Sequence, residues 1–517
     1  MREEVSNIAL ESGIAPPLNA EARDVAFGNE PVLAELKMKS VRGSTATVAG
    51  QAVNLFIRTG SMMILARLLT PFDFGLVAMV NGVTGFVGLF KDAGLSMATV
   101  QREKITPAQI STLFWINVAL SLALMLLLWA LAPFIALFYH EPRLTMITVA
   151  LGGAFLLGGL TVQHQALLRR QMKFTTLSII DILSLCSGIA TSIVMALMGF
   201  GYWAVVGNAV AAAFVNAVCV WVALGWIPGA PKRGCGTHSM LHFGGNVAGV
   251  NVASYFARNA DNILVGWCWG AGVLGFYDKA YQLLMLPINQ INSPISAVLM
   301  PALSRLQSAP KDLRDYFLGS YSLIVGITIP IILAICMFAH EVVYIVLGPK
   351  WQESAVIFQL LGPAALVGAI LNPFGSLLVA TGFSRRAFRI SLVVCPLIVL
   401  SFVLGLSYGA RGVAISYSMM MALLVVPLIL SMIHGTVIGF GDVVRAVRYP
   451  ALAGVCAFLA GTAYKWCVPL SASPALIGVS GCAIVVSVYA FILLVIFNQW
   501  HGLRQFLLSG LSRRVPK

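Results

Sequence analysis

The sequence predicts an all-α polytopic membrane protein with about fourteen transmembrane helices. Of its 517 residues, 59% are hydrophobic and only 10% are charged, whereas soluble proteins carry about 25% charged residues. The apolar runs are long and continuous, and a membrane β-barrel would instead show short segments of alternating polarity. Because a helix needs about 20 apolar residues to cross a bilayer, the length of the chain accommodates this number of spans.

Fourteen apolar runs, separated by polar breaks, mark the predicted spans. In chain order they are 45–69, 74–91, 107–139, 144–167, 175–199, 201–226, 241–268, 271–300, 317–347, 352–381, 386–408, 411–434, 447–469 and 473–498. The third and the ninth runs are longer than a bilayer is thick, so we expect these two helices to project from the membrane or to tilt.

The positively charged residues predict which ends of the helices face the cytoplasm. The tails and the even-numbered loops between spans hold 25 lysines and arginines, and the odd-numbered loops hold four. This asymmetry follows the positive-inside rule, and it predicts that both termini are cytoplasmic. The net charge of +14 follows the topology and forms no separate basic domain, so it does not indicate nucleic-acid binding.

The two ends of the chain are predicted to be tails outside the membrane. Residues 1–42 hold twelve charged residues and no apolar segment, so we expect a flexible cytoplasmic tail and no cleavable signal peptide. Residues 499–517 form a basic cytoplasmic tail. The nine cysteines are scattered, mostly within apolar runs, without the spacing of a metal site or a redox pair, so no metal is expected.

The first and the seventh predicted spans resemble each other when the chain is shifted by 200 residues. The identical pairs are Phe56–Phe256, Arg58–Arg258 and Gly75–Gly275, and the polar pairs are Gln51–Asn251 and Asn54–Ser254. Each stretch opens a group of six spans, and transporters are often built from two such halves with the substrate site between them. We therefore predict an N-lobe at 43–230, a C-lobe at 241–436 and two additional helices at 445–498.

Both stretches carry polar residues at helical spacing inside an apolar run. In the first, one face of the predicted helix carries Gln51, Asn54 and Arg58. In the second, the same face carries Asn251, Ser254, Arg258 and Asn262, with Asp261 beside it. A charge at the bilayer centre costs about 3 kcal/mol, so we expect both faces to line a water-accessible cavity between the lobes. Arginine binds phosphate oxygens through two parallel hydrogen bonds, and such a cavity suits an anionic ligand.

The other ionisable residues in the spans allow simpler interpretations. Arg258 and Asp261 are three positions apart and can neutralise each other within one helix, although that pairing leaves Arg58 unexplained. Asp181 lies near a predicted cytoplasmic helix end, where we expect it to pair with Lys173. The adjacent Asp278 and Lys279 are expected to point in different directions, with one of them facing the cavity.

The sequence contains no recognisable catalytic motif. It has no glycine-rich phosphate loop ending in GK[ST], no HExxH motif and no soluble nucleotide-binding domain. The odd-numbered loops are short, so no large extracytoplasmic catalytic segment is predicted. These observations favour a transporter over an enzyme.

Several segments together resemble a known family. They are LARLLTPFDFGLVAMV with FKDAGLSMATVQREKIT, ALLRRQMKF, YFARNADNILVG with LGFYDKAYQLLMLPINQINSPISAVLMPALSRLQ, and GPKW. They are similar to the Wzx-type lipid-linked oligosaccharide flippases, in particular the colanic-acid and succinoglycan exporters. These belong to the multidrug/oligosaccharidyl-lipid/polysaccharide (MOP) superfamily. The resemblance covers roughly residues 40 to 500, and the long N-terminal tail departs from it.

The resemblance implies a V-shaped core of two six-helix lobes with two extra helices. It also implies alternating access in the bacterial inner membrane. The implied substrate is an undecaprenyl-pyrophosphate-linked oligosaccharide destined for exopolysaccharide or lipopolysaccharide, with polymerase and export machinery as partners.

On this hypothesis Arg58 and Arg258 bind the pyrophosphate. The residues expected to contact phosphate or the first sugar are Gln51, Asn54, Asn251, Asn259 and Asn262. Asp261 and Asp278 are the candidates for coupling to H+ or Na+, and no other cofactor is expected.

Two other functions compete with this hypothesis. A multidrug antiporter of the same superfamily would need acidic and aromatic residues for organic cations, whereas the two polar faces carry arginine. A membrane glycan polymerase or ligase would need paired carboxylates and a larger extracytoplasmic segment.

Overall fold

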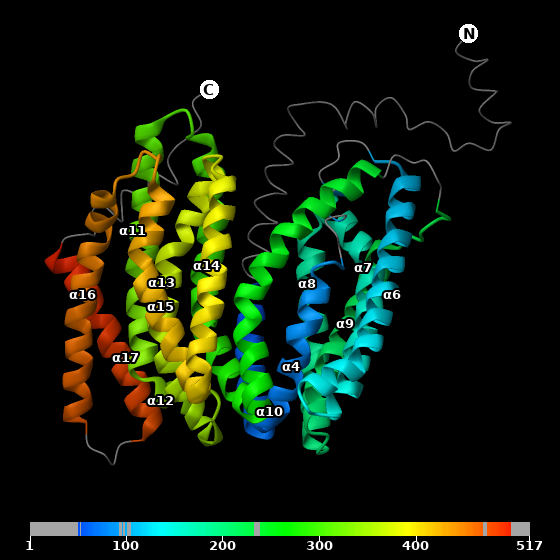
Figure 1. The fold of residues 1–517 in the computed structure, drawn as a ribbon, viewed down its shortest axis with the longest axis horizontal. Coiled ribbons are helices and arrows are strands. Elements are labelled where there is room, and N and C mark those ends of the chain that lie inside the picture. The colour runs from blue at the N-terminus through cyan, green and yellow to red at the C-terminus, as the bar shows by residue number, and fades with distance from the viewer. Residues whose placement is uncertain are drawn as a thin grey trace, which may run out of the picture.

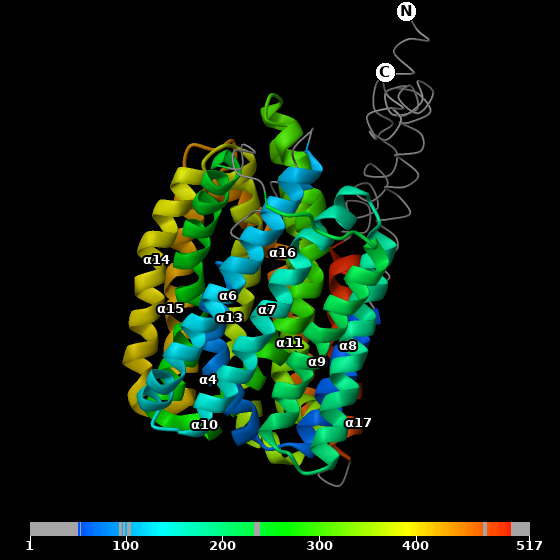
Figure 2. The ribbon, with the colours of Figure 1, turned by 90° about the vertical axis from the view of Figure 1, so that its right-hand side faces the viewer.

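The computed structural model describes residues 50–51, 53–91, 96, 99–100, 105–231, 238–468 and 473–497. Side chains are described for all of these except 238–254, 256–258, 293–294 and 297. Within these ranges the chain is helical with short connections, and no strand is present. Figures 1 and 2 show the long helices running side by side along one direction, as the spans of one bilayer do.

The first half of the described chain contains six long helical segments. They are residues 53–68, α4 (Pro71–Gly88), α6 (Pro107–Phe138), α7 (Arg143–Arg170), α8 (Phe174–Leu197) and α9 (Tyr202–Leu224). Two of them, α4 and α6, begin with the same kind of N-terminal cap. Thr70 before α4 and Thr106 before α6 each cap the first turn with the side chain, and each is followed by a proline, which has the φ angle that a helix start needs.

The second half begins with the longest helix. Its elements are α10 (His238–Arg305), α11 (Pro310–Met337), α12 (Ala339–Val346), α13 (Gln352–Ala380), α14 (Ser384–Gly405), α15 (Gly409–Ile433), α16 (Phe440–Cys467) and α17 (Pro474–Phe491). At Gly270 the backbone has φ 77° and ψ −180°, a conformation that interrupts the helix and that glycine adopts readily. Two arms of α10 therefore meet at Gly270, as the predicted boundary between the seventh and eighth spans requires.

Each of the fourteen predicted spans overlaps a described helix or an arm of α10, with one correction. The ninth run, 317–347, is not one tilted helix. It breaks at Phe338, where φ is −103° and ψ is 37°, into α11 and the short α12. By length and hydropathy, ten segments of the described chain qualify as membrane spans, one of which contains both α14 and α15.

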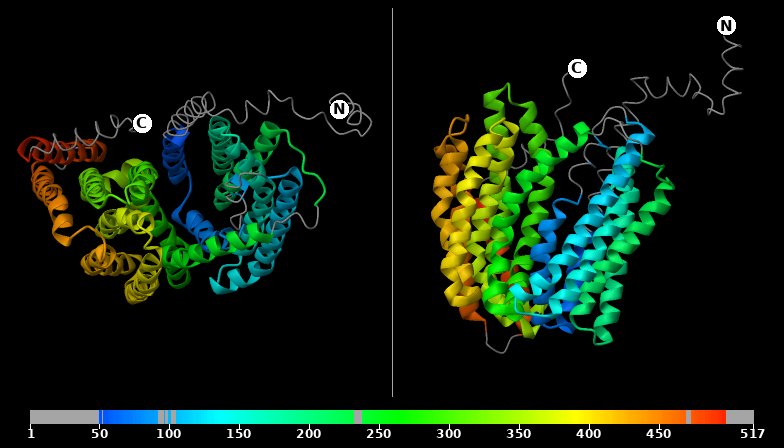
Figure 3. Two further views of the ribbon diagram at one scale, coloured as in Figure 1. Left: turned by 90° about the horizontal axis from the view of Figure 1, so that it is seen from above. Right: turned by 45° about the vertical axis from the view of Figure 1, so that its right-hand side comes forward.

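The helices form two groups, which we call the N-lobe and the C-lobe. In the N-lobe, α6 packs on α7, and α9 packs on both α7 and α8. In the C-lobe, α15 packs on α13 and α14, while α16 and α17 pack against α11 at its outer side. Helix α10 contacts α13 and α14 of the C-lobe and also α4 of the N-lobe, and Figures 1 and 3 show it between the two groups.

The contact between α4 and α10 confirms the repeat of 200 residues. A methyl group added at Gly75 would lie 1.7 Å from the carbonyl oxygen of Ala271, and one added at Gly275 would lie 1.8 Å from that of Pro71. The two contacts are reciprocal, as at an interface with two-fold symmetry. The lobes thus cross at a point where only glycine lets the two backbones approach this closely.

Candidate functional site

A cavity of about 400 Å³ lies where the first helix, α8 and α10 meet. Its lining residues are Gly50, Gln51, Asn54, Leu55, Arg58, Ser178, Asp181, Asn289 and Gln290. The structure therefore places the predicted polar face of the first helix, Gln51, Asn54 and Arg58, on one cavity. The face is opposed by polar side chains of the N-lobe and of the second arm of α10.

Arg58 is the cationic side chain in the lining of this cavity. Its Nε donates a hydrogen bond of 2.7 Å to Oδ1 of Asn54, one helical turn earlier. Within the described part of the chain this is its only hydrogen bond, so both Nη atoms of the exposed guanidinium remain available to a ligand. Asn54 holds one edge of the guanidinium and leaves the two-pronged edge free for an oxyanion.

Asp181 lies in the same cavity and corrects one expectation. Among the described ion pairs there is none between Asp181 and Lys173. Instead its carboxylate lies in the field of Arg58 and Arg169. Asp181 faces inward because α8 turns this side toward the first helix, where Gly50 approaches Ser178. The cavity therefore contains one positive and one negative side chain.

Asn289 and Gln290 are site residues that the sequence reasoning missed. They lie on the second arm of α10 and bring two amide side chains to the cavity. Their signal was present in the sequence, since both lie within the apolar run 271–300. A polar residue inside a span is expensive to place in lipid and so marks a functional candidate.

The second polar face is only partly described. Asn251 and Arg258 lie in α10, but their side chains fall outside the described residues. The pairing of two arginines across the lobes, and the alternative Arg258–Asp261 pair, therefore both remain predictions. Asn259 donates from Nδ2 to the carbonyl oxygen of Tyr255 at 3.1 Å, and Oδ1 of Asn262 is buried without a hydrogen-bond partner among the described residues. Neither asparagine lines the cavity.

Asp261 is buried between the two arms of α10, with 4% of its surface exposed. The hydroxyl of Tyr277 donates to its Oδ2 at 2.8 Å, and the backbone N–H of Asn262 donates to Oδ1 at 2.8 Å. The carboxylate therefore receives a donor from each arm. This arrangement ties the arms together and keeps Asp261 away from the cavity that Arg58 lines.

Asp278 and Lys279 correct a second expectation, because their side chains converge. Nζ of Lys279 lies 3.8 Å from Oδ2 of Asp278. Gln282 joins the pair: its Nε2 donates to Oδ2 of Asp278 at 2.7 Å, and its Oε1 accepts from Nζ of Lys279 at 2.9 Å. The lysine stem is long enough for Nζ to reach both the neighbouring Asp278 and Gln282, one turn later. Because both charges are buried, a paired cluster with no net charge is favoured over two separated ions. Neither residue lines the cavity.

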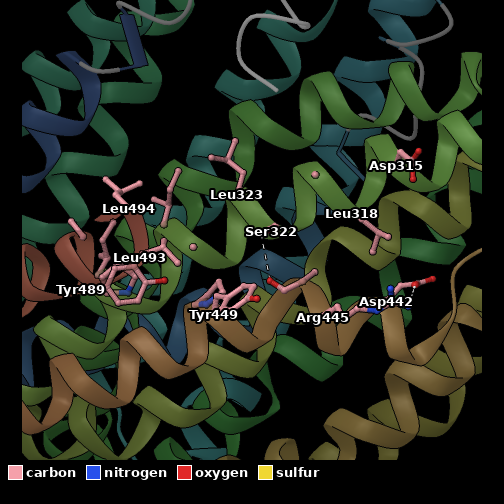
Figure 4. Close-up of a pocket in the computed structure, with 18 of the residues that line it drawn as sticks. Asp315, Leu318, Ser322, Leu323, Asp442, Arg445, Tyr449, Tyr489, Leu493 and Leu494 are labelled. Carbon is pink, nitrogen blue, oxygen red and sulfur yellow. Dashed lines mark hydrogen bonds and ion pairs between the residues drawn. The ribbon is translucent and has the colours of Figure 1, made fainter. Parts of the chain in front are cut away.

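A second, larger cavity of about 680 Å³ lies between α11, α16 and α17 (Figure 4). One end is charged, because Arg314 binds Asp442 through two hydrogen bonds of 2.9 and 2.6 Å, and Arg445 binds the same carboxylate at 3.0 Å. The rest is mainly apolar, as Figure 4 shows around Leu493 and Leu494. Its mainly apolar lining suits a hydrocarbon chain. No sequence pattern indicated this cavity, since its walls come from three separate segments.

Comparison with known proteins places the chain among polysaccharide biosynthesis proteins. The model of the family described as "Polysaccharide biosynthesis protein" matches residues 64–356. The chain is 24% identical over 389 residues to the lipopolysaccharide biosynthesis protein WzxC of Escherichia coli (strain K12), which covers 74% of this chain and 78% of that protein. It is 28% identical over 338 residues to the teichuronic acid biosynthesis protein TuaB of Bacillus subtilis (strain 168), covering 63% and 68%.

Solved structures show the same fold. The lipid II flippase MurJ in an inward closed conformation aligns with a TM-score of 0.70 at 13% identity, over 89% of this chain and 100% of that chain. An inward-facing multidrug resistance MATE family transporter of the MOP superfamily aligns with a TM-score of 0.60 at 14% identity, over 76% and 95%. At these identities the likeness concerns the fold, and it confirms the two-lobed architecture expected from the sequence.

Proposed function

The chain belongs to the polysaccharide biosynthesis protein family, and from this membership we propose that it flips a lipid-linked oligosaccharide across the bacterial cytoplasmic membrane. The proposed substrate is an oligosaccharide repeat unit on undecaprenyl pyrophosphate, used for exopolysaccharide or lipopolysaccharide. The names of the relatives support this assignment. They are biosynthesis proteins for lipopolysaccharide and teichuronic acid, and the MOP-type fold is shared with a lipid II flippase.

The observation that carries the proposal is the free guanidinium edge of Arg58 in a polar cavity between transmembrane helices. An arginine that faces lipid would be costly, and Arg58 instead lines a cavity with four amide side chains, those of Gln51, Asn54, Asn289 and Gln290. Pyrophosphate offers the paired oxygens that a guanidinium binds. Amides are suited to sugar hydroxyls, because each offers both donors and acceptors.

We place the cytoplasm at the end of the molecule where the first helix begins. The positive-inside rule assigns the tails and the even-numbered loops, which hold 25 lysines and arginines, to the cytoplasm. The cavity includes Gly50 and Gln51 at the start of the first helix, whereas the crossing of Gly75 and Gly275 lies beyond that helix's other end. This arrangement corresponds to a state that loads its headgroup from the cytoplasmic side.

The apolar cavity is the proposed place for the hydrocarbon chain of the substrate. Gly326 lines this cavity, and a methyl group added there would make an ordinary van der Waals contact of 3.8 Å with Leu493, so a leucine at this position would fill part of the cavity. We expect Gly326→Leu to lower export while the protein level in the membrane is maintained. Gly368→Leu, at a helical glycine with open space around it, is the matched control.

Ion coupling is assigned to Asp261 in preference to Asp278. Asp278 already has the ammonium of Lys279 beside it, whereas the described partners of Asp261 are two neutral donors. A proton or a sodium ion would therefore change the charge balance most at Asp261. Flipping measured in proteoliposomes under an imposed proton or sodium gradient should lose its gradient dependence in Asp261→Asn, and an unchanged dependence would remove this residue from the assignment.

The central experiment measures polysaccharide export in a deletion strain that carries Arg58 variants. Arg58→Ala should abolish export, and Arg58→Lys should restore only part of it because an ammonium lacks the two-pronged geometry. Arg143→Ala is the control, since Arg143 is an exposed arginine at the start of α7 that pairs with Glu141. Full export by Arg58→Ala, at normal abundance in the membrane, would overturn the proposed function.

A further inference from the structure

Trp351, the last residue of the GPKW segment, belongs to the C-lobe but is anchored on the N-lobe. Its indole is fully buried, at 0% exposure. Its Nε1 donates a hydrogen bond of 2.8 Å to the carbonyl oxygen of Ala66, near the end of the first helix. The turn that presents it depends on Gly348, whose φ of 100° is accessible mainly to glycine.

The indole is wedged between two aromatic rings from the helices that cross. Phe74 of α4 lies with its ring centroid 5.7 Å from that of Trp351, and Phe276 of α10 lies at 6.0 Å. Each phenylalanine is adjacent to one of the crossing glycines. Within the C-lobe, α13 is joined to α10 at this point, because the hydroxyl of Ser354 donates to the carbonyl oxygen of Phe276 at 2.8 Å. Trp351 therefore packs beside the crossing of α4 and α10.

Two cationic side chains add contacts between the lobes at the same end. Nη2 of Arg67, from the N-lobe, donates to the carbonyl oxygen of Ile345 in α12 at 2.9 Å. Nζ of the buried Lys279, from α10, lies 4.3 Å from the ring centroid of Phe74, within the range of a cation–π contact. Residues 345–351 and Lys279 thus contact the same short stretch of the N-lobe, residues 66–74.

We propose that residues 345–351 form a latch that holds the lobes together at the end opposite the Arg58 cavity. The latch consists of the Trp351–Ala66 and Arg67–Ile345 hydrogen bonds and the Lys279–Phe74 contact. All three cross from one lobe to the other, so all three break when the lobes separate at this end. This role accounts for the GPKW segment, which touches neither cavity. Only one part of this inference rests on the proposed function, namely that the latched end is the side on which the substrate is released.

The latch can be tested without transport, by hydrogen exchange of the purified full-length protein in lipid nanodiscs. The reporters are amides on both sides of the contact, such as those of Leu69, Leu347 and Gly348, which are hydrogen-bonded in the closed form. Arg67→Met keeps the stem of an exposed side chain and removes its donor. We expect about fivefold to tenfold faster exchange in residues 66–75 and 345–351, because one hydrogen bond at an exposed position is lost.

Arg411→Met is the matched control for Arg67→Met. Arg411 is also exposed and pairs with Glu353 at 3.0 and 2.5 Å, but this pair joins α13 and α15 within the C-lobe. For the second latch variant, Trp351→Phe, the control is Trp269→Phe, which removes a hydrogen bond of 2.8 Å to Leu406 inside the same lobe. Both controls should leave the exchange of residues 66–75 unchanged.

The outcomes separate the latch from the transport proposal. Faster exchange on both lobes in Arg67→Met and Trp351→Phe, with unchanged controls, supports the latch even if Arg58→Ala still exports polysaccharide. Exchange that is the same in Arg67→Met and in the wild type overturns the latch. Equal acceleration in Arg67→Met and Arg411→Met does so too, because it would show general loosening of the fold.

Discussion

The reciprocal glycines at the crossing of α4 and α10 allow a prediction worked from distances. In Gly275→Ala the new methyl carbon would lie 1.8 Å from the carbonyl oxygen of Pro71, whereas carbon and oxygen in such contacts lie about 3.3 Å apart. The two backbones must therefore separate by about 1.5 Å at this point. Neither partner can give way alone, because the obstructing atom belongs to a helix backbone and not to a flexible side chain.

The cost of that separation falls on the state in which the lobes are closed at this end. Overpacking of a well-packed contact costs about 1–3 kcal/mol, which corresponds to a shift of about 5-fold to 150-fold toward states with this end open. Because the contact is reciprocal, Gly75→Ala, with its methyl 1.7 Å from Ala271, should have the same effect. The assay is hydrogen exchange of residues 71–75 and 271–275, together with the thermal unfolding midpoint.

The control for Gly275→Ala lies three residues earlier in the same arm of α10. A methyl group at Gly272 would meet nothing within 4 Å, so Gly272→Ala should be neutral or slightly stabilising through helix propensity. If Gly275→Ala behaved like Gly272→Ala in both measurements, the lobes would not be in close contact at this crossing, and the reasoning from the repeat would be refuted.

The buried polar groups of α10 give the remaining predictions, both read from thermal unfolding. Tyr277→Phe removes the side-chain donor to Asp261 and should lower stability by about 1–3 kcal/mol, while Tyr321→Phe, which removes a buried hydroxyl without a partner, should have little effect. Equal loss in the two variants would contradict the role of the hydrogen bond. Lys279→Met leaves the Asp278 carboxylate buried without its counter-charge and should cost about 3–5 kcal/mol. The double variant with Asp278→Asn should recover most of that loss, and failure to recover it would show that the lysine acts mainly through Phe74.

The sequence predicted the spans well because hydropathy and positive charge respond to the bilayer itself, and the bilayer acts on every segment alike. It also revealed the repeat, because Gly75 and Gly275 make equivalent close backbone contacts in the two halves and no larger residue fits at either position. The break at Phe338 was missed because it contains neither glycine nor proline and lies within a continuous apolar run. Nothing in the local pattern distinguishes such a break from a long tilted helix.

The candidate site was only half accessible to the same reasoning. Helical spacing placed Gln51, Asn54 and Arg58 on one face, because that face is a property of a single helix. The opposing residues are a matter of tertiary packing, so Asp181 was assigned to the wrong partner and Asn289 was not considered. The convergence of Asp278 and Lys279 was missed for a related reason. Adjacent residues start in different directions, but Gln282 bridges them one turn later.

The break at Gly270 bears on how the chain enters the membrane during synthesis. No loop separates the two arms of α10, so they form a tight helical hairpin. Asp261 lies in the first arm, and its partner Tyr277 follows 16 residues later in the second. An aspartate inside a span resists insertion by about 3 kcal/mol, so the hydrogen bond from Tyr277 favours insertion of the two arms together. Chains that end at Gly270 should therefore insert the first arm poorly, whereas chains that extend to Arg305, the end of the second arm, should insert both arms together.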